Sequence, residues 1–343
     1  MTETDLAAAV RAAVDQWMQA TTPAEQVAQL SCPGKLSTDL VAIAAPLLMQ
    51  AGHTAAGVRD FFLASPYRLL PGAFLATQLP DTPLGFFPVP DSPATIAGRA
   101  AALAIHGLLQ LETVAYGTEN SGSLFVNLVA MPGEGKVPAK SKDRMRGHTD
   151  AVSFPFNGED DALNPRIAPS PDLVTLVGLR NPGAVPTRLM PLNAILALMT
   201  PEDIAELKKP QYLINSQTTF VPGMKKMLGK EHIAYDEPVL KEGAIGTYVR
   251  FSHTKVIAPE EGGPAQRALD SFEAACNQVA QPVIVNPGDL LIINNRLGTH
   301  GRGAVGDDVG GQSRWLLRAY GLDTDELDPQ KRHAGGPEYV LFP

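Results

Sequence analysis

The segment "RMRGHTDAVSFPF" places His148 two residues before Asp150. In an extended backbone the side chains at positions i and i+2 point to the same face, so this imidazole and this carboxylate could bind one metal ion together. They could equally be two unrelated polar side chains at the end of a strand. An isolated His-x-Asp pair is more often the second, so the decision depends on what the rest of the sequence supplies.

A second segment, "NPGDLLIINNRLGTHGR", contains an apolar run and ends just after His300. With His148 and Asp150, this residue supplies two imidazoles and one carboxylate. That is the facial set that holds non-haem Fe(II) and leaves coordination positions open for a chelating cosubstrate and oxygen. A structural zinc site would normally be closed by four ligands. The set therefore predicts a catalytic ferrous site with these three side chains as its metal ligands.

Two arginines follow His300 in the strand-like run "SRWLLRAYG". Arg314 lies fourteen residues after His300, on a strand that we expect to lie beside the strand carrying this histidine. A guanidinium can hold a carboxylate through two parallel hydrogen bonds, so Arg314 is a candidate for the far carboxylate of 2-oxoglutarate. Arg318 is on the same face, about 13 Å further along an extended strand. It is a candidate for the carboxylate of a substrate.

The elements that must position these residues change character along the chain. The first third has helical periodicity, with Thr4 as the expected N-cap of the first helix and further helices expected over 36–51, 54–64 and 93–109. From about Val114 the sequence consists of short β-branched or alternating runs bounded by Gly, Pro and Asn, which predict strands. Helical insertions are expected near 200–208 and 264–280. The runs that predict strands include "SLFVNLVAMP", "AVSFPF", "DLVTLVGLR", "GTYVRFSH", "QPVIVNPGDLLIINN" and "RWLLRAYGL".

Many short strands without strand–helix alternation favour a double-stranded β-helix, or jelly roll, over a parallel doubly wound sheet. The predicted fold class is therefore β-rich α+β, with a jelly-roll core, an N-terminal helical layer and helical insertions. We expect one domain over 1–343. Its parts are a mainly helical layer (1–112), the core (113–322) and a C-terminal tail (323–343).

Composition excludes several classes of partner. The chain has 343 residues and a net charge of −8, which argues against nucleic acid or an anionic membrane as the main partner. Its two cysteines are far apart, so a disulfide framework or a thiolate metal site is not expected. The acidic, amphipathic N-terminus is unlike a secretory signal, and no apolar run is long enough for a membrane span. These features predict a cytoplasmic protein whose partner is a small molecule; they do not indicate its oligomeric state.

Taken together, "GHTD", "PGDLLIINNRLGTHGR" and "SRWLLRAYG" resemble the clavaminate synthase-like branch of the Fe(II)/2-oxoglutarate oxygenases, which includes asparagine, arginine and lysine hydroxylases. The resemblance covers roughly 113–322. It implies Fe(II), 2-oxoglutarate and O2 as cofactor and cosubstrates, and hydroxylation of a free L-amino acid. It implies that His148, Asp150 and His300 are metal-binding and catalytic, that Arg314 binds 2-oxoglutarate, and that Arg318 binds the substrate's α-carboxylate.

Three further residues are expected to contribute to the site. The resemblance implies that Glu119, in "YGTENSG", contacts the amino end of the substrate, and we also expect Thr175 to contribute to 2-oxoglutarate binding and His253 to contact the substrate. The sequence also departs from the family pattern at two places. It has Asp150 where the amino-acid hydroxylases usually have Glu, and it has "FSHT" (251–254) where relatives with cationic or amide substrates place an acid. We therefore expect a neutral or acidic side chain on the substrate.

Three alternatives stay open at this level. One is a taurine-dioxygenase-like oxygenase acting on another small acid, although the spacing between His300 and Arg314 differs somewhat from that branch. Another is a desaturase on the same scaffold. The third is a jelly-roll binding or structural protein that retains a vestigial metal site.

Overall fold

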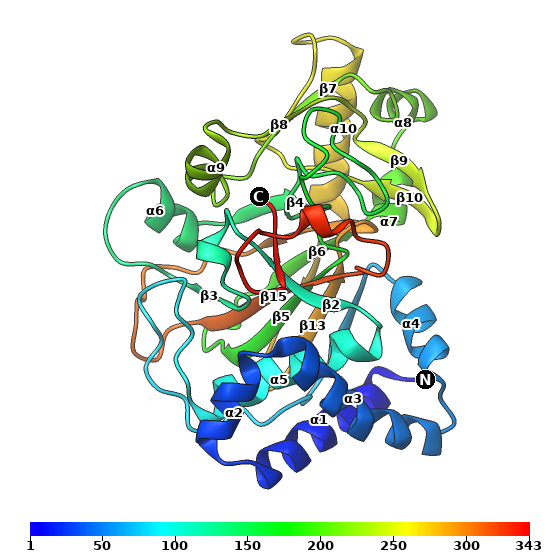
Figure 1. The fold of residues 1–343 in the computed structure, drawn as a ribbon. Helices are drawn as coiled ribbons and strands as arrows, with labels where there is room; N and C mark the ends of the chain where they lie inside the picture. Colours follow the sequence, from blue (N-terminus) through cyan, green and yellow to red (C-terminus); the bar gives the residue numbers. More distant parts are fainter.

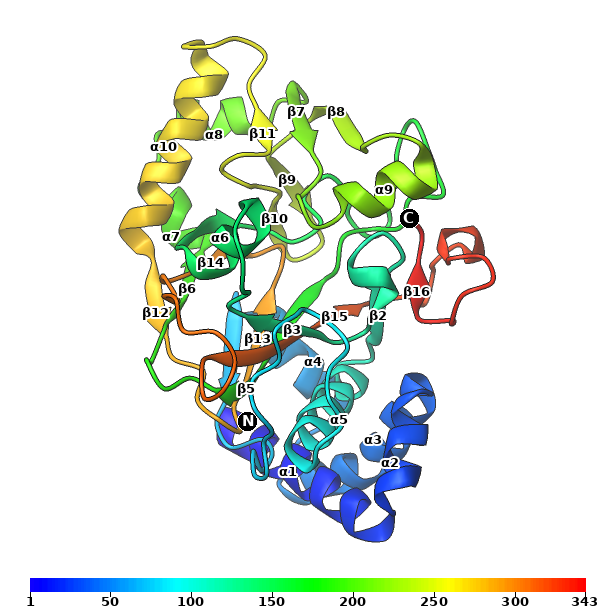
Figure 2. The ribbon, with the colours of Figure 1, turned by 90° about the vertical axis from the view of Figure 1, so that its left-hand side faces the viewer.

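The computed structural model describes residues 1–343. Helices from the first third cover one face of a central sheet, and a second sheet with its insertions lies over the other face (Figure 1). Figure 2 shows these layers after a quarter turn, with α10 along the side of the upper part. The helical layer comprises α1 (Glu3–Ala20), α2 (Pro23–Leu30), α3 (Pro33–Gln50), α4 (Ala55–Leu63) and α5 (Pro93–Leu108). The later helices are α6 (Lys136–Lys142), α7 (Leu192–Leu196), α8 (Pro201–Leu207), α9 (Val221–Leu228) and α10 (Pro264–Val279), and the 3-10 turns are η1 (Asn120–Gly122) and η2 (Pro329–Lys331).

The central sheet has seven strands in the order β1-β13-β5-β15-β2-β16, with β3 also paired to β15. All its pairs are antiparallel except β2 with β16, which is parallel. Its strands are β1 (Tyr67–Leu70), β2 (Glu112–Tyr116), β3 (Val126–Val129), β5 (Leu173–Arg180), β13 (Leu290–Asn294), β15 (Trp315–Leu322) and β16 (Val340–Leu341). Both chain ends therefore contribute to this sheet, because β1 comes from the helical layer and β16 from the C-terminal tail.

The second sheet has four antiparallel strands in the order β12-β6-β14-β4. They are β4 (Met145–His148), β6 (Thr187–Pro191), β12 (Gln281–Val283) and β14 (Gly298–Arg302). Two smaller sheets belong to the insertion above it (Figure 1). The first contains β7 (Tyr212–Asn215), β8 (Ile233–Glu237) and β11 (Val256–Ile257), and the other contains β9 (Leu240–Gly243) and β10 (Gly246–Val249).

The alternation of side chains along β15 separates two parts of the core. Trp315 and Leu317 pack with the N-terminal helices, whereas Leu316 and Tyr320 belong to a cluster between the two large sheets. Helix α5, rich in alanine, is buried along nearly its whole length, and it packs directly against β5. The N-terminal helices therefore cover one face of the central sheet. Its other face is turned toward the second sheet and can line an internal site between the two sheets.

Most elements expected from sequence are present. The mixed α and β composition is confirmed, and α3, α4, α5, α8 and α10 lie within three residues of their predicted bounds. Two expectations are wrong. The N-cap of α1 is Thr2, whose hydroxyl accepts a hydrogen bond from the Asp5 N–H in a capping box, and not Thr4. The run 151–156 forms turns and not a strand, because Ala151 adopts a left-handed conformation (φ +52°) directly after Asp150.

No single helix is long and apolar enough to cross a membrane. Helices α3 and α4 together have the length and apolar composition of a membrane span, but the chain bends by 92° at the break between them. Length and composition are the only features that support this reading.

Gly178 in β5 is required by close backbone packing. A Cβ at this position would lie 2.0 Å from the carbonyl oxygen of Asn286, in the turn that leads into β13. We expect Gly178→Ala to lower the free energy of unfolding by about 2 kcal/mol or more, because the turn has to move. Urea denaturation measures this, with Gly183→Ala as the control, since a Cβ there meets only a Val185 methyl at 3.7 Å. Equal stability of the two variants would contradict the prediction.

Candidate active site

The two histidines of the predicted metal site lie on neighbouring strands. In the antiparallel pair β4–β14, His300 is directly opposite His148, and the centroids of the two rings are 4.4 Å apart. A Cβ on the next residue, Gly301, would lie 2.5 Å from the carbonyl oxygen of Met145, so glycine is needed for the strands to approach this closely. The strand pairing thus joins two segments that are remote in sequence.

Asp150 reaches the same point from the turn that follows β4. Its Oδ1 is 3.6 Å from Nε2 of His148, and its Oδ2 is 3.9 Å from Nε2 of His300. Potential donor atoms of all three residues lie within 4.8 Å of one another. His148 is the last residue of β4, whereas Asp150 lies in the turn that follows. The two side chains therefore converge because the chain changes direction, and not because alternate side chains of one extended strand share a face.

Neighbouring groups orient these side chains. The Nδ1–H of His148 donates to the carbonyl oxygen of Arg146 at 2.9 Å, which leaves the Nε2 lone pair free for a metal. Asn295 accepts a hydrogen bond from the N–H of Asp150 at 2.9 Å and donates to its carbonyl oxygen at 3.0 Å. Gln217 donates to Oδ1 of Asp150 at 3.3 Å and accepts from the N–H of Ala151 at 2.8 Å. The backbone and carboxylate of Asp150 are thus held from two separate segments.

The protonation states suit a cation. Burial alone would raise the pKa of Asp150, but the hydrogen bond with His148 and the positive charge available on His300, His148 and Arg318 lower it overall. Burial, with the nearby His148, lowers the pKa of His300 to about 3, so this imidazole is neutral at neutral pH. Neutral imidazoles and an ionised carboxylate are the forms that bind metal ions. The donor set therefore fits Fe(II), with room for further ligands on the cavity side.

The three residues line a cavity of about 180 Å³, to which β5 of the central sheet contributes Val174 and Leu176. Arg314 also lines it, with 5% of the residue exposed and with no hydrogen-bond partner for Nε or Nη1. Burial and the nearby Arg302 lower the pKa of Arg314 to about 9, so the guanidinium stays charged at neutral pH. A buried charge without a partner is costly, so this arrangement favours an anion beside Arg314.

Arg318 lines the same cavity but already has a partner. Its Nη1 and Nη2 donate to the two carboxylate oxygens of Glu119 at 3.1 and 2.7 Å, and the hydroxyl of Thr219 donates to the same carboxylate at 2.9 Å. Its guanidinium carbon lies 4.2 Å from the centroid of the Tyr320 ring. Burial alone would lower the pKa of Arg318, but the charge of Glu119 outweighs it and the pKa is raised. The two residues form a largely buried ion pair at the cavity wall.

Comparison with known proteins agrees with this geometry. No family model matches the chain. The chain is 26% identical over 277 residues to the L-asparagine oxygenase of Streptomyces coelicolor, covering 79% of this chain and 76% of that one. It is 24% identical over 210 residues to the L-lysine 3-hydroxylase of Catenulispora acidiphila, covering 60% of this chain and 54% of that one. The match thus spans only about half of the lysine hydroxylase.

Solved structures extend the likeness over nearly the whole chain. Asparagine oxygenase with Fe(II), 3-hydroxyasparagine and succinate superposes with a TM-score of 0.70 at 23% identity, covering 94% of this chain and 97% of that one. The non-heme iron oxygenase OrfP, with Fe, succinate and a dihydroxy-L-Arg, superposes with a TM-score of 0.71 at 21% identity, covering 98% and 97%. The likeness to these solved structures shows that the chain shares their fold. The similarity to an asparagine oxygenase and a lysine hydroxylase fits the predicted clavaminate synthase-like branch.

One inference about Arg314 needs correction. We expected its strand to lie beside the strand that carries His300, but β15 belongs to the central sheet and β14 to the second sheet. The segment 303–313 crosses from one sheet to the other. Arg314 therefore approaches the cavity from the opposite wall, and its distance from the metal ligands is set by the separation of two sheets and not of two neighbouring strands.

The structure also places two residues that were expected to contact cosubstrate and substrate outside this cavity. Thr175 points away from it, because side chains alternate along β5, and its hydroxyl lies 2.8 Å from Nε2 of His106 in α5. His253 pairs with Glu273 of α10 and contacts Arg146 in an adjoining hollow. The expectation that these two residues contact cosubstrate and substrate is corrected on this geometry.

Some residues of the cavity were not found from sequence. Thr187, at the start of β6 and opposite Arg302 in register, presents a buried hydroxyl where Thr175 was expected to do so. Gln217 and Lys140 line the cavity from polar segments whose sequences resemble exposed loops. Asn295, which holds the backbone of Asp150 without lining the cavity, had a signal, since it lies in the motif that leads to His300.

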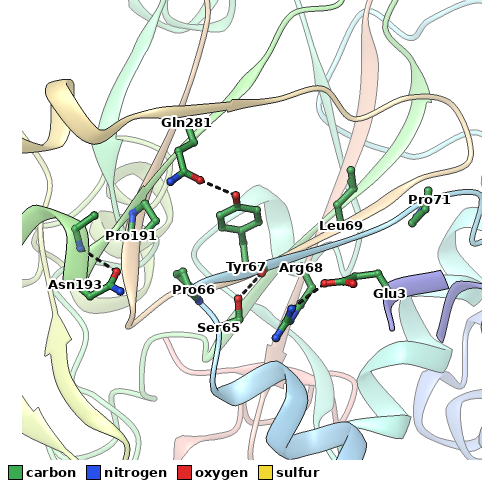
Figure 3. A pocket seen from close by; sticks show the side chains of 11 residues that line it. Glu3, Ser65, Pro66, Tyr67, Arg68, Leu69, Pro71, Pro191, Asn193 and Gln281 are labelled. Carbon is green, nitrogen blue, oxygen red and sulfur yellow. Dashed lines mark hydrogen bonds and ion pairs between the residues drawn. The ribbon is translucent and has the colours of Figure 1, made fainter. Parts of the chain in front are cut away.

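A separate hollow lies over β1, away from the metal ligands (Figure 3). Its polar side chains satisfy one another. The hydroxyl of Tyr67 donates to Gln281 at 2.7 Å, and Nη1 of Arg68 donates to Glu3 at 2.8 Å (Figure 3). None of His148, Asp150 and His300 lines this hollow, so it is separate from the candidate metal site.

Proposed function

We propose that the protein is an Fe(II)- and 2-oxoglutarate-dependent oxygenase that hydroxylates an unactivated carbon of a free L-amino acid. The observation that carries this proposal is a single cavity that brings together His148, Asp150 and His300 with an unpartnered arginine and a Glu–Arg ion pair. The two large sheets, one on each side of this cavity, are assigned to the two halves of a double-stranded β-helix. The relatives support the activity class and both cofactors, since their structures contain iron with succinate or α-ketoglutaric acid.

His148, Asp150 and His300 would hold Fe(II) through Nε2, a carboxylate oxygen and an imidazole nitrogen. The bound iron would supply the activation of O2 that couples decarboxylation of 2-oxoglutarate to oxidation of a C–H bond. Arg314 binds the far carboxylate of 2-oxoglutarate, for which its fork geometry and buried charge are suited. Thr187 replaces Thr175 as the candidate hydroxyl for this cosubstrate.

The Glu119–Arg318 pair is assigned to the substrate. A free amino acid carries an ammonium and a carboxylate on one carbon, and these two groups complement Glu119 and Arg318 respectively. Arg318 binds the α-carboxylate and Glu119 the α-ammonium group, which directs the side chain toward the metal ligands. The relatives are named for free amino acids, namely asparagine, lysine, and ornithine or arginine. For this chain we propose a neutral or acidic side chain.

A panel of the twenty amino acids tests this function. The purified protein is supplied with Fe(II), 2-oxoglutarate and one amino acid at a time, and succinate and product mass are measured. We expect one amino acid or a small group to stimulate succinate formation, with a product that has gained one oxygen. Omission of iron or of 2-oxoglutarate is the control. Absence of stimulation by every amino acid would contradict the proposal, and a product that has lost two hydrogens would identify a desaturase instead.

A further inference from the structure

Helix α6 carries a lysine, Lys140, in a position to contact the side chain of a bound substrate. Lys140 lines the cavity that contains the metal ligands, and it also lines the adjoining hollow that opens beside His148. Burial lowers its pKa, whereas the charges of Asp150 and Glu119 act in the opposite direction. Lys140 has no carboxylate within ion-pair distance. It is thus a cation that faces the reaction site without a partner.

Hydrogen bonds hold the segment that carries Lys140 against β14, the strand that contains His300. Nη2 of Arg302, two residues after His300 in β14, donates to the carbonyl oxygens of Lys140 and Asp143 at 3.0 and 2.9 Å. The N–H of Val305 donates to the carbonyl oxygen of Lys142 at 2.7 Å. The backbone of α6 is therefore held at a defined position relative to His300, so a group bound by Lys140 would be positioned relative to the metal as well.

The charges around the cavity favour an anion at this point. Only two acids line it, and both are engaged: Asp150 lies between the two histidines and Glu119 is paired with Arg318. Once Arg314 is assigned to 2-oxoglutarate and Arg302 to backbone carbonyl oxygens, the cations that remain are Lys136 and Lys140 of α6. A guanidinium or ammonium side chain would find no free carboxylate here, whereas a carboxylate side chain would find a lysine.

We propose that Lys140 is a specificity-determining residue that binds the side-chain carboxylate of an acidic amino acid, a substrate class that differs from the asparagine, lysine and ornithine or arginine of the named relatives. This inference rests on the proposed function and narrows it. A site whose charged group pairs with one particular substrate group discriminates against an analogue that lacks that group. The carboxylate and its amide have nearly the same shape, so charge alone separates them.

The test compares isosteric substrates. Steady-state succinate formation is measured with L-aspartate against L-asparagine and with L-glutamate against L-glutamine. We expect kcat/KM of the wild-type protein to be higher for the acid in at least one pair. In Lys140→Met the ratio of acid to amide should fall by about tenfold or more, as loss of a charged hydrogen bond predicts, and Lys140→Arg should retain part of it. Lys142→Met is the matched control, because Lys142 is on the same helix but pairs with Asp307 at 3.2 Å.

A binding measurement accompanies the kinetics. Calorimetry under anaerobic conditions, with Fe(II) and 2-oxoglutarate present, gives the dissociation constant of each amino acid for the three variants and the wild type. Wild-type preference for the amide or for a cationic amino acid would overturn the inference while leaving the proposed function intact. The inference would also be overturned if Lys140→Met lowered kcat/KM equally for the acid and the amide, or if it raised only the KM for 2-oxoglutarate. If no amino acid binds or stimulates succinate formation, the proposed function itself fails, and this inference falls with it.

Discussion

Replacing His300 with alanine will abolish amino-acid-dependent succinate formation and weaken Fe(II) binding by at least about a hundredfold. The reason is that the proposed site offers three protein ligands, and His300 would supply one of the two imidazoles. Even loss of a partner that merely orients a metal ligand typically costs 10- to 100-fold in affinity, so loss of the ligand itself should cost no less. Metal binding is measured by anaerobic calorimetry, independently of turnover.

The matched control for this prediction is His53→Ala. His53 lies in the helical region and contacts Asp5 at 3.2 Å, far in the sequence from the metal site, so its loss should leave iron binding and turnover unchanged. Far-ultraviolet circular dichroism verifies that both variants are folded. A His300→Ala protein that binds Fe(II) with wild-type affinity and turns over normally would refute the ligand assignment, and with it the proposed function.

The second prediction concerns Arg314. Arg314→Met should raise the KM for 2-oxoglutarate by about a hundredfold while changing the KM for the amino acid far less. A charged, two-pronged hydrogen bond is worth about 1.5–3 kcal/mol or more, and each 1.4 kcal/mol corresponds to a factor of ten. Steady-state kinetics with each substrate varied in turn measure both constants.

A stability measurement separates this role from a structural one. Because Nε and Nη1 of Arg314 have no partner within the protein, the metal-free variant should be at least as resistant to urea as the wild type. An arginine that held the fold together would behave in the opposite way. The reciprocal variant is Glu119→Gln with Arg318→Met, which removes both charges of the buried pair and should raise the KM for the amino acid and not for 2-oxoglutarate. If either variant raised the KM for 2-oxoglutarate and the KM for the amino acid equally, Arg314 and the Glu119–Arg318 pair would not have the separate roles proposed for them.

The convergence of His148, Asp150 and His300 could be predicted from sequence because each occurs in a recognisable local motif. The order His-x-Asp, His and Arg carries the chemistry, and strand pairing between β4 and β14 then brings the two segments together. What could not be predicted was which sheet each strand joins. The spacing between His300 and Arg314 is the same whether β15 lies beside β14 or across from it, and the structure has it across.

The wrong assignment of Thr175 has a related cause. In a strand that faces solvent on one side, alternating polarity shows which residues point inward. Strand β5 is buried along nearly its whole length, with helices on one side and the cavity on the other, so its sequence "LVTLVGLR" has no such alternation. Thr175 therefore lies in the helix-facing layer with His106. Lys140 was missed for another reason, because α6 is short and polar and resembles an exposed loop in sequence.

The ion pair between Glu119 and Arg318 has a consequence for molecules that contain an amino acid without being one. Both partners are already satisfied before anything binds, so an incoming compound has to separate them and satisfy each in turn. The first residue of a peptide, or an amino acid attached as a thioester, has lost the anionic terminus, and an N-acylated amino acid has lost the cationic terminus. Each would leave one member of the pair stranded in a buried environment, which costs several kcal/mol. On the proposed function, hydroxylation therefore precedes any step that links this amino acid to another molecule.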